Sequence, residues 1–530
     1  MKKITRLCSF ILIAVFLFIL SSCGGSKSGV YGELSYTASR NKIVVDVEFD
    51  ENKHLESGKA VPYLQLYVLN GDDETYKTNK TLEFTNDVYT KSSASFTDLT
   101  KDTDYVIYLF VTFNGKDEEI AKIEAKTASS GDTAENATII KTAEDFEAMA
   151  NDPEGYYVLN NDIDFDGKTL PAMFTSSSSK QFKGTFDGQG FTISNFNLKS
   201  ESNVGVFGYT NTAVIKNLNM NNVNADFSSS GKSNSNIGAL VGSANKTTIE
   251  NCKVSDVKIK IKGSTSAELN VGGVIGFGEN LSLKNITAED VSIEYLQARL
   301  KVSTGLFAGK LKGNSLNSDN VIVDDCNASG SLIVNCHFTS AVGYVYVGGF
   351  VGNLGTASLI KDSYSNADIV VSRSKDSSTN YNYFNLAVGG FMGINNEGSI
   401  NILSCAAIAD ITGYAGIKPT DGVSVDYSNS IMCEDSDDIK NNAYFGGFAG
   451  KTIDLFAKIE NAVYVKKSTG VNVNAASVNK AEREYLYVSE LIGTNTDKAE
   501  KIVNSFVAAQ DSDLSVLSKD IQDIINNYLN

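Results

Sequence analysis

Three carboxylates at alternate positions form the pattern in this chain that comes closest to a metal site. Asp162, Asp164 and Asp166 would share one face of a strand, because successive side chains point to opposite faces. A twelve-residue calcium loop begins with this spacing and ends with a bidentate carboxylate, but the twelfth residue from Asp162 is Met173. The segment is therefore interpreted as a solvated edge, with calcium as the weaker candidate, and the sequence predicts neither a metal site nor a cofactor.

Residues that could act as catalysts are scarce. Asp324 and Asp325 are adjacent, so on a strand they would point to opposite faces and could not flank one bond. The two histidines, His54 and His337, belong to no HExxH pattern, and neither a GxSxG nor a Walker pattern occurs. We therefore predict a protein that is not an enzyme.

Aromatic residues gather in three insertions, at positions 330–346, 372–386 and 412–444, which lengthen a repeated pattern. Tyrosine offers rigid contact area with a polar end, which suits sugar or protein ligands. Insertions at one repeat position of a solenoid lie on one face, and that face often binds. The sequence thus predicts a ligand-binding face, with loops packed on themselves as the equal alternative. Its candidate residues are Tyr344, Tyr346, Tyr381, Tyr383, Phe384, Tyr414 and Tyr427.

The repeated pattern is a phrase in which glycines flank an apolar tetrad or pentad. The first glycines of the early copies lie 33 or 34 residues apart, and later steps are longer. Self-similarity at a nearly fixed period indicates a solenoid. The copies read VGVFG (204–208), IGALVG (237–242), VGGVIG (271–276), TGLFAG (304–309), VGGFVG (347–352), VGGFMG (388–393) and FGGFAG (445–450), followed by a degenerate VSELIG (488–493).

Each repeat also carries an apolar residue with a polar residue two positions later. The polar column is Asn217, Asn251, Asn285, Asp325, Asp362, Ser404, Asn461 and Asn504. Alternation of apolar and polar residues, strict over 281–295, predicts strands, and three short strands per repeat suit a coil of a parallel β-helix. Cys252, Cys326 and Cys405 share the next column and are interpreted as small buried residues. Because polysaccharide lyases and hydrolases also use β-helices, a polysaccharide-degrading enzyme is the alternative function.

The first residues read as a targeting signal. Lys2, Lys3 and Arg6 precede an apolar run, and LSSC at 20–23 resembles the lipobox of bacterial lipoproteins. The resemblance implies a signal peptide over 1–22 and lipidation of Cys23, with residues 23–29 as anchor and tether. Acyl chains bury about 0.8 kcal/mol per CH₂, so two or three chains would hold the protein at a membrane.

Residues 30–128 differ from the repeats and alternate as short strands. In ASFTDLTKDTDY (94–105), Leu99 precedes Tyr105 by six residues, and this segment resembles the tyrosine corner of fibronectin type III domains. The chain has no tryptophan, which departs from that family. The resemblance implies a fibronectin type III- or Ig-like β-sandwich and does not fix its strand topology.

The glycine phrases resemble the GLUG motif of bacterial surface proteins. The short helix expected at 143–151 and the segment FKGTFDGQGFTISNFNL (182–198) resemble the N-terminal cap and first coils of those proteins. This implies a right-handed parallel β-helix over 134–511, an architecture without an assigned chemistry. Residues 512–530 predict a C-terminal capping helix with an apolar stripe, needed because a last coil exposes its edge.

The formal charge of −17 argues against nucleic-acid partners, which need clustered lysine and arginine. Taken together, the sequence predicts an all-β, lipid-anchored protein at the extracytoplasmic cell membrane or cell surface. Its expected role is adhesion through a glycan or a host or matrix protein.

Overall fold

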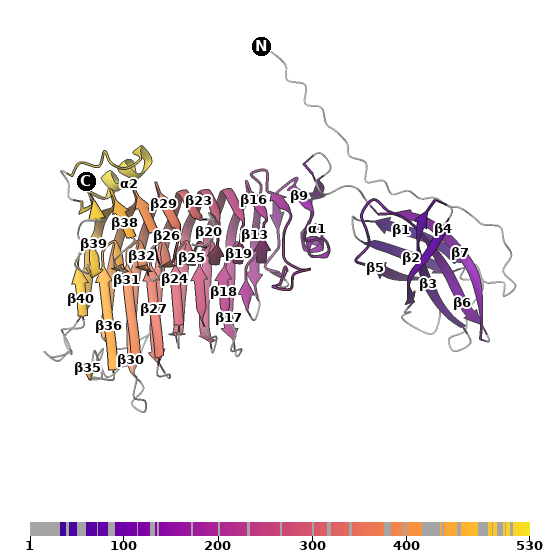
Figure 1. Ribbon diagram of the computed structural model, residues 1–530, viewed down its shortest axis with the longest axis horizontal. Coiled ribbons are helices and arrows are strands. Elements are labelled where there is room, and N and C mark those ends of the chain that lie inside the picture. The colour runs from indigo at the N-terminus through magenta and orange to yellow at the C-terminus, as the bar shows by residue number, and fades with distance from the viewer. Residues whose placement is uncertain are drawn as a thin grey trace, which may run out of the picture. The chain divides into compact units, whose positions relative to one another are not determined.

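The computed structural model describes residues 32–529 except 39–41, 50–59, 72, 83–90, 114, 128–132, 135–136, 171–172, 200–201, 230–233, 265–267, 299–300, 315–319, 339–341, 376–382, 396–397, 399, 416–434, 437–438, 453–456, 475–485, 490, 495–501, 504 and 509–511. The chain divides into two compact units at residue 138 (Figure 1). Within the described residues, no helix is both long and apolar enough to cross a membrane.

Two antiparallel sheets share one hydrophobic core in the first unit. Period-2 alternation explains this core, because Leu64, Leu66, Ile107 and Leu109 all point to one side of their sheet and are fully buried. The assignment of this unit as a fibronectin type III- or Ig-like sandwich stays a prediction. One sheet contains β1 (Gly32–Ala38), β2 (Ile43–Phe49) and β5 (Lys91–Phe96), and the other β4 (Asp73–Thr81), β3 (Ala60–Asn70), β6 (Asp104–Phe113) and β7 (Lys116–Lys126).

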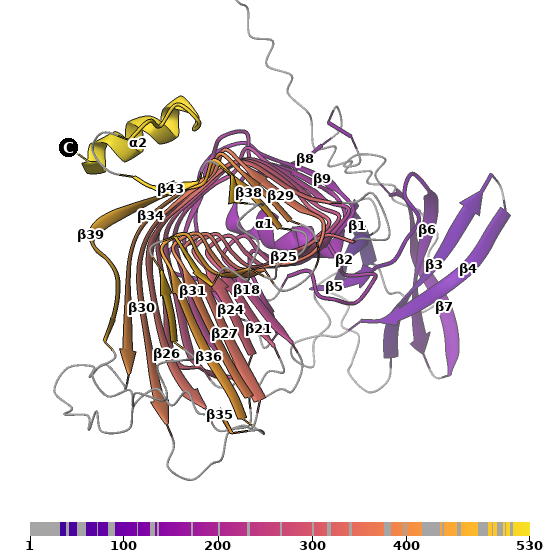
Figure 2. The same cartoon turned by 60° about the vertical axis from the view of Figure 1, so that its left-hand side comes forward.

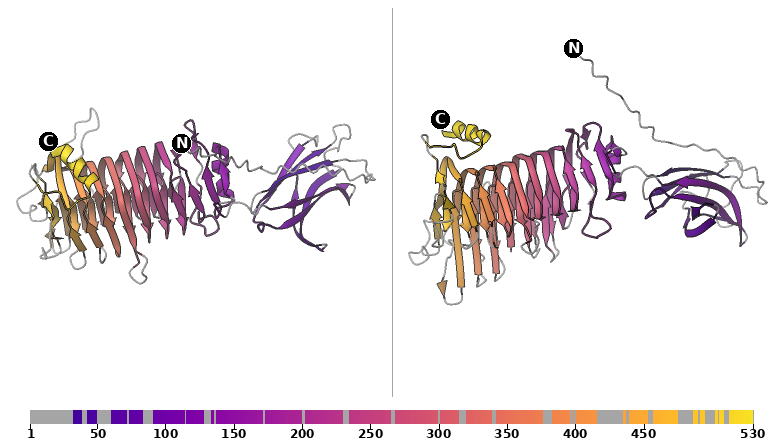
Figure 3. Two further views of the ribbon diagram at one scale, coloured as in Figure 1. Left: turned by 90° about the horizontal axis from the view of Figure 1, so that it is seen from above. Right: turned by 45° about the horizontal axis from the view of Figure 1, so that its top comes forward.

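The second unit is a parallel β-helix, which confirms the repeat-based prediction. Each coil adds strands to three parallel sheets, and Figures 1 and 3 show the coils stacked side by side along one axis. In Figure 2 the first sheet bends around two sides of the coil. Sheet I contains β8 (Thr138–Ile140), β9 (Tyr156–Leu159), β10 (Ile163–Asp164), β11 (Thr169–Leu170), β12 (Thr185–Asp187), β13 (Thr192–Leu198), β16 (Val214–Lys216), β17 (Asn219–Ser229), β20 (Thr248–Ser264), β23 (Ser282–Ala298), β26 (Val321–Phe338), β29 (Ser358–Lys361), β30 (Tyr364–Lys375), β33 (Ile400–Leu403), β34 (Ala406–Ala415), β38 (Ala457–Glu460), β39 (Val463–Asn474), β42 (Ile502–Val503) and β43 (Phe506–Val507).

The glycine phrases form the tight connection between the other two sheets. Sheet II supplies the strand before each phrase and sheet III the strand after it. Sheet II contains β14 (Asn203–Val204), β18 (Ser235–Gly238), β21 (Leu269–Gly272), β24 (Lys301–Gly305), β27 (Val342–Gly348), β31 (Tyr383–Gly389), β35 (Asp435–Ser436), β36 (Ile439–Gly446) and β40 (Leu486–Ser489). Sheet III contains β15 (Phe207–Asn211), β19 (Val241–Asn245), β22 (Ile275–Glu279), β25 (Ala308–Lys312), β28 (Val351–Leu354), β32 (Met392–Asn395), β37 (Ala449–Thr452) and β41 (Ile492–Thr494).

The polar column of the repeat turns the corner within sheet I. Its described members, from Asn217 to Asn461, all have φ between 49° and 55°. Asparagine and aspartate tolerate this left-handed conformation better than other non-glycine residues, which explains their recurrence. The column also forms a ladder: Asn251 Nδ2 donates to Asn217 Oδ1 at 3.2 Å, and Asn285 Nδ2 to Asn251 Oδ1 at 2.9 Å.

The cysteine column is buried, as predicted. Cys252, Cys326 and Cys405 are free thiols at most 4 % exposed. Burial raises the pKa of Cys252 and of Cys405 to about 12, so both thiols are protonated at neutral pH. They act as small core residues and not as nucleophiles.

Helices lie at both ends of the solenoid. The expected N-terminal helix appears as α1 (Ala143–Ala148) and η1 (Met149–Asn151), with a capping box between Thr142 and Asp145. Phe146 enters the solenoid core, where its ring lies 5.5 Å from that of Phe165. The C-terminal helix, α2 (Lys519–Leu529), is shorter than the predicted 512–530.

The C-terminal helix packs on the side of the last coils. Ile521 and Ile525 share a buried cluster with Ile408 and Val463, which lie on β34 and β39 and are separate from the core inside the coils. Figure 2 shows α2 beside these strands. The described contacts of α2 therefore cover an outer apolar face, and coverage of the open last coil stays a prediction.

Candidate ligand-binding surface

The described residues of the first two aromatic insertions are strand, and this corrects the expectation that they form loops. Residues 330–346 lengthen β26 and β27, and residues 372–386 lengthen β30 and β31. The lengthened strands pair in parallel register, for example Tyr344 with Asn385. The physical reason is that matched insertions in successive coils can extend two neighbouring ladders, which satisfies the backbone better than separate loops would.

Two of the predicted binding tyrosines lie together on β27. The rings of Tyr344 and Tyr346 are stacked, with centroids 4.4 Å apart and planes 7° apart. Tyr346 is 6 % exposed and packs with Ala387, Ile394 and Tyr444, whereas Tyr344 is half-buried at the margin of this cluster. We call these five residues the tyrosine cluster; the strands hold its rings rigidly outside the main core.

Lysines border the tyrosine cluster on both sides. Lys301 Nζ lies 5.8 Å from the ring centroid of Tyr344, and Lys451 Nζ lies 4.4 Å from that of Tyr444. Lys451 also donates a hydrogen bond to the Tyr444 hydroxyl at 3.2 Å, and burial lowers the pKa of its ammonium. Cation–π contacts contribute about 0.5–1 kcal/mol where the cation is exposed, as Lys301 is, and about 2 kcal/mol where it is desolvated, so the lysines help to fix the rings.

A partly buried ion pair lies beside the cluster in the preceding coils. Lys310 Nζ lies 3.1 Å from Glu268 Oε1, with side chains 12 % and 19 % exposed. Burial first, and then the Glu268 charge, raises the pKa of Tyr346, so its phenol stays neutral. Sequence reasoning missed Lys301, Lys310, Lys451 and Glu268, because only the register of sheets II and III reveals that they face the tyrosines.

The other predicted aromatic residues divide into two groups. Tyr383 and Phe384 begin β31, and Tyr414 lies near the end of β34. Tyr381 and Tyr427 lie outside the described residues, as does the predicted lipidation residue Cys23. The structure thus brings together Tyr344 and Tyr346, and adds Tyr444, which lay at the edge of the third insertion.

The cluster occupies one column of sheet II whose chemistry changes along the solenoid. In the early coils, Asn270 Nδ2 donates to Asn236 Oδ1 and Asn236 Nδ2 donates to Asn203 Oδ1, each at 2.9 Å. In register with these residues, the later coils place first Ser303 and then Tyr346, Ala387 and Tyr444. A polar ladder is therefore replaced by aromatic area where the coils widen.

The aspartates of the calcium candidate serve the local backbone. Asp162 Oδ1 accepts a hydrogen bond from the Thr192 N–H at 2.7 Å, and Asp164 accepts from the Asp166 N–H at 2.8 Å and from Asn195 Nδ2 at 2.9 Å. Hydrogen bonds from Asp166 and Asn195 hold the pKa of Asp164 below its usual value. Among the described residues, no group of three His, Cys, Asp or Glu side chains is placed to hold a metal ion.

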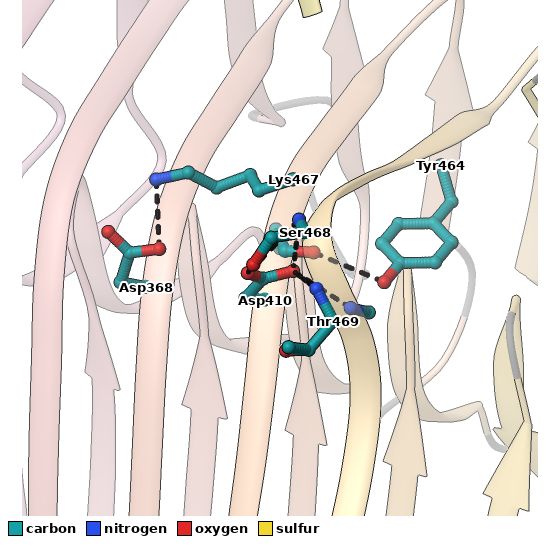
Figure 4. A network of polar contacts seen from close by, with 8 residues as sticks. Asp368, Asp410, Tyr464, Lys467, Ser468 and Thr469 are labelled. Atoms are coloured by element: carbon teal, nitrogen blue, oxygen red, sulfur yellow. Dashed lines mark hydrogen bonds and ion pairs between the residues drawn. The ribbon is translucent and has the colours of Figure 1, made fainter. Parts of the chain in front are cut away.

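Carboxylates of sheet I are likewise engaged in structure. Asp324 Oδ2 lies 2.9 Å from Lys361 Nζ, whereas its neighbour Asp325 is a left-handed corner residue. On the same sheet, Asp410 receives backbone N–H bonds from Ser468, Thr469 and Gly470 at 2.8–3.0 Å (Figure 4). These three residues belong to a bulge in β39, where the register with β34 shifts.

Part of the chain matches a known protein family. Residues 132–256 match the family described as the M26 IgA1-specific metallo-endopeptidase N-terminal region. A solved IgA1 protease is similar at 15% identity and a TM-score of 0.33; the match covers 84% of this chain, which spans 28% of that one. No curated protein matches the chain.

Two solved polysaccharide-active enzymes are similar at a lower level. A Yersinia enterocolitica family 28 exopolygalacturonase matches at 9% identity and a TM-score of 0.14, over 88% of this chain and 99% of that one. An Erwinia chrysanthemi pectate lyase, solved with tetragalacturonic acid, matches at 9% identity and a TM-score of 0.12, over 70% and 84% of the two chains. These values are too low to bear on function.

The family match contradicts the prediction that the protein is not an enzyme. That prediction rested on missing catalytic motifs, and a fold built from structural repeats does not by itself decide the function of the protein that contains it. A metallo-endopeptidase uses a metal ion, and neither the sequence nor the described side chains offer a fitting ligand set. We therefore assign no catalytic step to these residues.

Proposed function

We propose that this chain is a lipid-anchored protein of the cell surface whose β-helix binds an extracellular glycan or a host or matrix protein. The observation that carries the proposal is the tyrosine cluster, where an asparagine ladder gives way to stacked rings in the widened coils. Such rigid aromatic area with lysines at its border suits recognition, because little side-chain entropy is lost on binding.

Within this proposal, the first unit is a fibronectin type III- or Ig-like sandwich that separates the binding solenoid from the membrane. Support comes from the Thr100 N–H, which donates to the Tyr105 hydroxyl at 2.9 Å as a tyrosine corner requires. The solenoid is taken as right-handed with GLUG-type repeats. The lipobox supports acylation of Cys23.

Membrane attachment is tested by the Cys23→Ser variant of the full chain expressed in bacteria. We expect loss of metabolic acyl labelling and loss of partition into the detergent phase. The unchanged protein is the positive control, and a Cys8→Ser variant is the matched cysteine control. A Cys23→Ser protein that is still labelled would refute the anchor.

Ligand binding is tested by screening the mature chain on glycan arrays and on immobilised matrix proteins. For any ligand found, Tyr344→Ala should weaken binding about fivefold, because stacking one partly exposed ring is worth about 1 kcal/mol. Tyr209→Ala is the matched control, since this half-buried tyrosine lies on sheet III far from the cluster in sequence. Equal losses for the two variants, or no loss for either, would exclude the tyrosine cluster.

A second candidate follows from the family match. The region matched at 132–256 is named for an IgA1-specific metallo-endopeptidase, so the β-helix here is proposed to hold a protein substrate for proteolysis. Incubation of the chain with IgA1, and with IgG as control, separates the two roles. Binding without cleavage supports recognition alone, whereas chelator-sensitive cleavage establishes a peptidase.

A further inference from the structure

An aromatic array covers the outer face of the four-stranded sheet in the first unit. Along β3 and β6, one side of the sheet carries the buried leucines and isoleucine of the core, and the other side carries rings. An outer face of an antiparallel sheet is ordinarily polar, so this face is unusual. The array consists of Tyr63, Tyr67, Tyr76, Tyr108 and Phe110.

The five rings form one continuous surface. Tyr63 stacks on Phe110 at 5.5 Å with planes 17° apart, and Tyr108 lies 6.1 Å from Phe110. Tyr67 makes edge contacts with Tyr108 and with Tyr76, each at 5.5 Å. Tyr63 and Tyr67 are four residues apart on β3, so the array extends roughly 13 Å along the strand.

Contacts between rings can stabilise a sheet whether or not the rings are exposed to solvent. The exposure of these rings is therefore separate evidence for a binding role. Tyr76 is 51% exposed, and the other four rings are partly exposed. Contiguous aromatic area left open to solvent on a monomer commonly marks a binding site. The rings are held by cross-strand pairing, so the surface is ordered before any ligand arrives.

Hydrogen-bonding groups surround the rings. The Tyr108 hydroxyl donates to the Glu74 carboxylate at 2.8 and 2.9 Å, and the Tyr67 hydroxyl donates to Gln65 Oε1 at 2.7 Å. Asp117 accepts from Thr112 Oγ1 at 2.6 Å. Burial, followed by hydrogen bonding to a carboxylate, raises the pKa of Tyr63 and of Tyr108 to about 12, so both phenols remain neutral donors.

The charge around the array selects among ligands. Glu74 on β4 and Asp117 and Glu119 on the neighbouring strand β7 border the array, and Lys122 Nζ lies 5.8 Å from the centroid of the Tyr108 ring. This acidic border, on a chain of net charge −17, repels polyanions. Carboxylate and amide oxygens accept hydrogen bonds from hydroxyl groups, and ring faces attract the C–H faces of sugars.

We propose that the outer face of β4, β3 and β6 binds a neutral polysaccharide chain, with Tyr63, Tyr67, Tyr76, Tyr108 and Phe110 as the stacking platform. This site is separate from the tyrosine cluster of the β-helix and belongs to the other unit. A neutral glycan fits this face because Gln65 lies between Tyr63 and Tyr67 on β3, and Glu74 and Asp117 border the rings, so acceptors for sugar hydroxyl groups lie beside the stacking surface. In this proposal the first unit, which was proposed above as a spacer, also binds a ligand.

The test uses the mature full chain in native affinity gels that contain soluble barley β-glucan, xyloglucan, galactomannan or polygalacturonate. We expect retardation by at least one neutral polymer and none by polygalacturonate. Because the chain has no tryptophan, ligand binding is also measurable as a change in tyrosine fluorescence. Equal retardation by polygalacturonate, or no retardation by any neutral polymer, would overturn the proposal.

Substitutions locate the site. Tyr76→Ala should weaken binding of the retarding polymer about tenfold and Tyr76→Phe should retain it, whereas Val61→Ala, at an equally exposed position of β3, should have no effect. Circular dichroism melting of each variant shows that the sheet is intact. Unchanged binding for both Tyr76→Ala and Tyr67→Ala would refute the site.

Self-association of the sheet face is the competing outcome. Analytical ultracentrifugation of the unliganded chain should show one mass that does not depend on concentration. A dimer that dissociates in Tyr76→Ala would mean that a second copy covers the array, and this would also overturn the proposal. Tyr344→Ala tests the tyrosine cluster of the β-helix, whereas Tyr76→Ala tests the aromatic array. The two variants therefore distinguish failure of this site from failure of the proposed function.

Discussion

The ring of Phe391 lies 4.8 Å from the ring of Phe350, with their planes 3° apart. This separation equals the spacing of neighbouring parallel strands, so the rings repeat with the coils. The stack continues to Phe307 at 4.5 Å from Phe350 and to Phe448 at 5.0 Å from Phe391. All four rings are fully buried. Phe350 and Phe391 have a stacked ring on both sides, and Phe307 and Phe448 have one on a single side.

Removal of one ring from this stack should destabilise the solenoid. Phe391→Ala leaves a cavity between two rings and is expected to lower the free energy of unfolding by about 3–5 kcal/mol. Phe391→Leu fills most of the space and should cost clearly less. Chemical denaturation followed by circular dichroism measures the free energy of unfolding of both variants. Equal losses would show that filling the space left by the ring contributes nothing to stability.

The asparagine corners should tolerate glycine better than a branched residue. Asn251 has φ of 53° and donates to Asn217 Oδ1. Asn251→Val forces a β-branched side chain into this conformation and should cost about 1–3 kcal/mol. Asn251→Gly keeps the backbone and loses only ladder hydrogen bonds, worth about 1 kcal/mol. A melting temperature lower for Asn251→Gly than for Asn251→Val would contradict this account.

Gly349 is required by close packing and not by its backbone angles. A Cβ atom there would lie 1.9 Å from the Gly390 carbonyl oxygen and 2.9 Å from the Ala367 Cβ, so Gly349→Ala should destabilise two coils. Gly167→Ala is the control, because it has φ of 74° but nothing within 4 Å, and should cost about 1 kcal/mol. Thermal melting of the two variants compares the cost of a steric clash at position 349 with the cost of backbone strain at position 167. A milder effect at Gly349 would show that the coils move apart easily.

Substitutions of Tyr346 and Tyr344 should have different effects, the first mainly on stability and the second mainly on ligand binding. Tyr346→Ala removes a ring that is 6 % exposed and should cost about 3–5 kcal/mol, as large buried residues do. Tyr344→Ala removes a half-buried ring and should cost less while reducing ligand binding. Denaturant midpoints measured beside affinities distinguish the two. Loss of binding in Tyr346→Ala without loss of stability would mean that this ring, and not Tyr344, contacts the ligand.

Stability should depend on pH through Asp410. Burial alone would raise the pKa of this carboxyl, but hydrogen bonds from Ser468, Gly470 and Thr469 hold it below its usual value. A lowered folded pKa contributes stability above the unfolded value of about 3.9, and that stability is lost as the pH falls through the folded value. Asp410→Asn should therefore be less stable than the unchanged protein at pH 7, with the difference shrinking below about pH 4. Urea unfolding at several pH values checks this, and a difference independent of pH would exclude the carboxylate charge as the cause.

Local chemistry made the solenoid predictable from the sequence. The glycine phrases and the column from Asn217 to Asn461 recur because each coil needs the same close approach and the same left-handed corner. The alternation that buries Ile215 and Ile249 follows from strand geometry alone. Burial of Cys252, Cys326 and Cys405 followed from their shared column. These features depend on residues adjacent in sequence or one repeat apart, so the sequence carries them directly.

The binding surfaces depend on which residues meet across strands, and only the tertiary structure decided that. The sequence placed Tyr344 and Tyr346 in an insertion, but the register of β24, β27 and β36 buries Tyr346 beside Tyr444 and brings Lys301 over Tyr344. Tyr67, Tyr76 and Tyr108 are far enough apart along the chain that no local pattern groups them, and antiparallel pairing makes them one surface. The outward residues Ile408 and Val463 are covered by α2, and this packing also depends on residues that are distant in sequence. Repeats fix the coil by local geometry, whereas contacts between strands and helices arise only when the chain is folded.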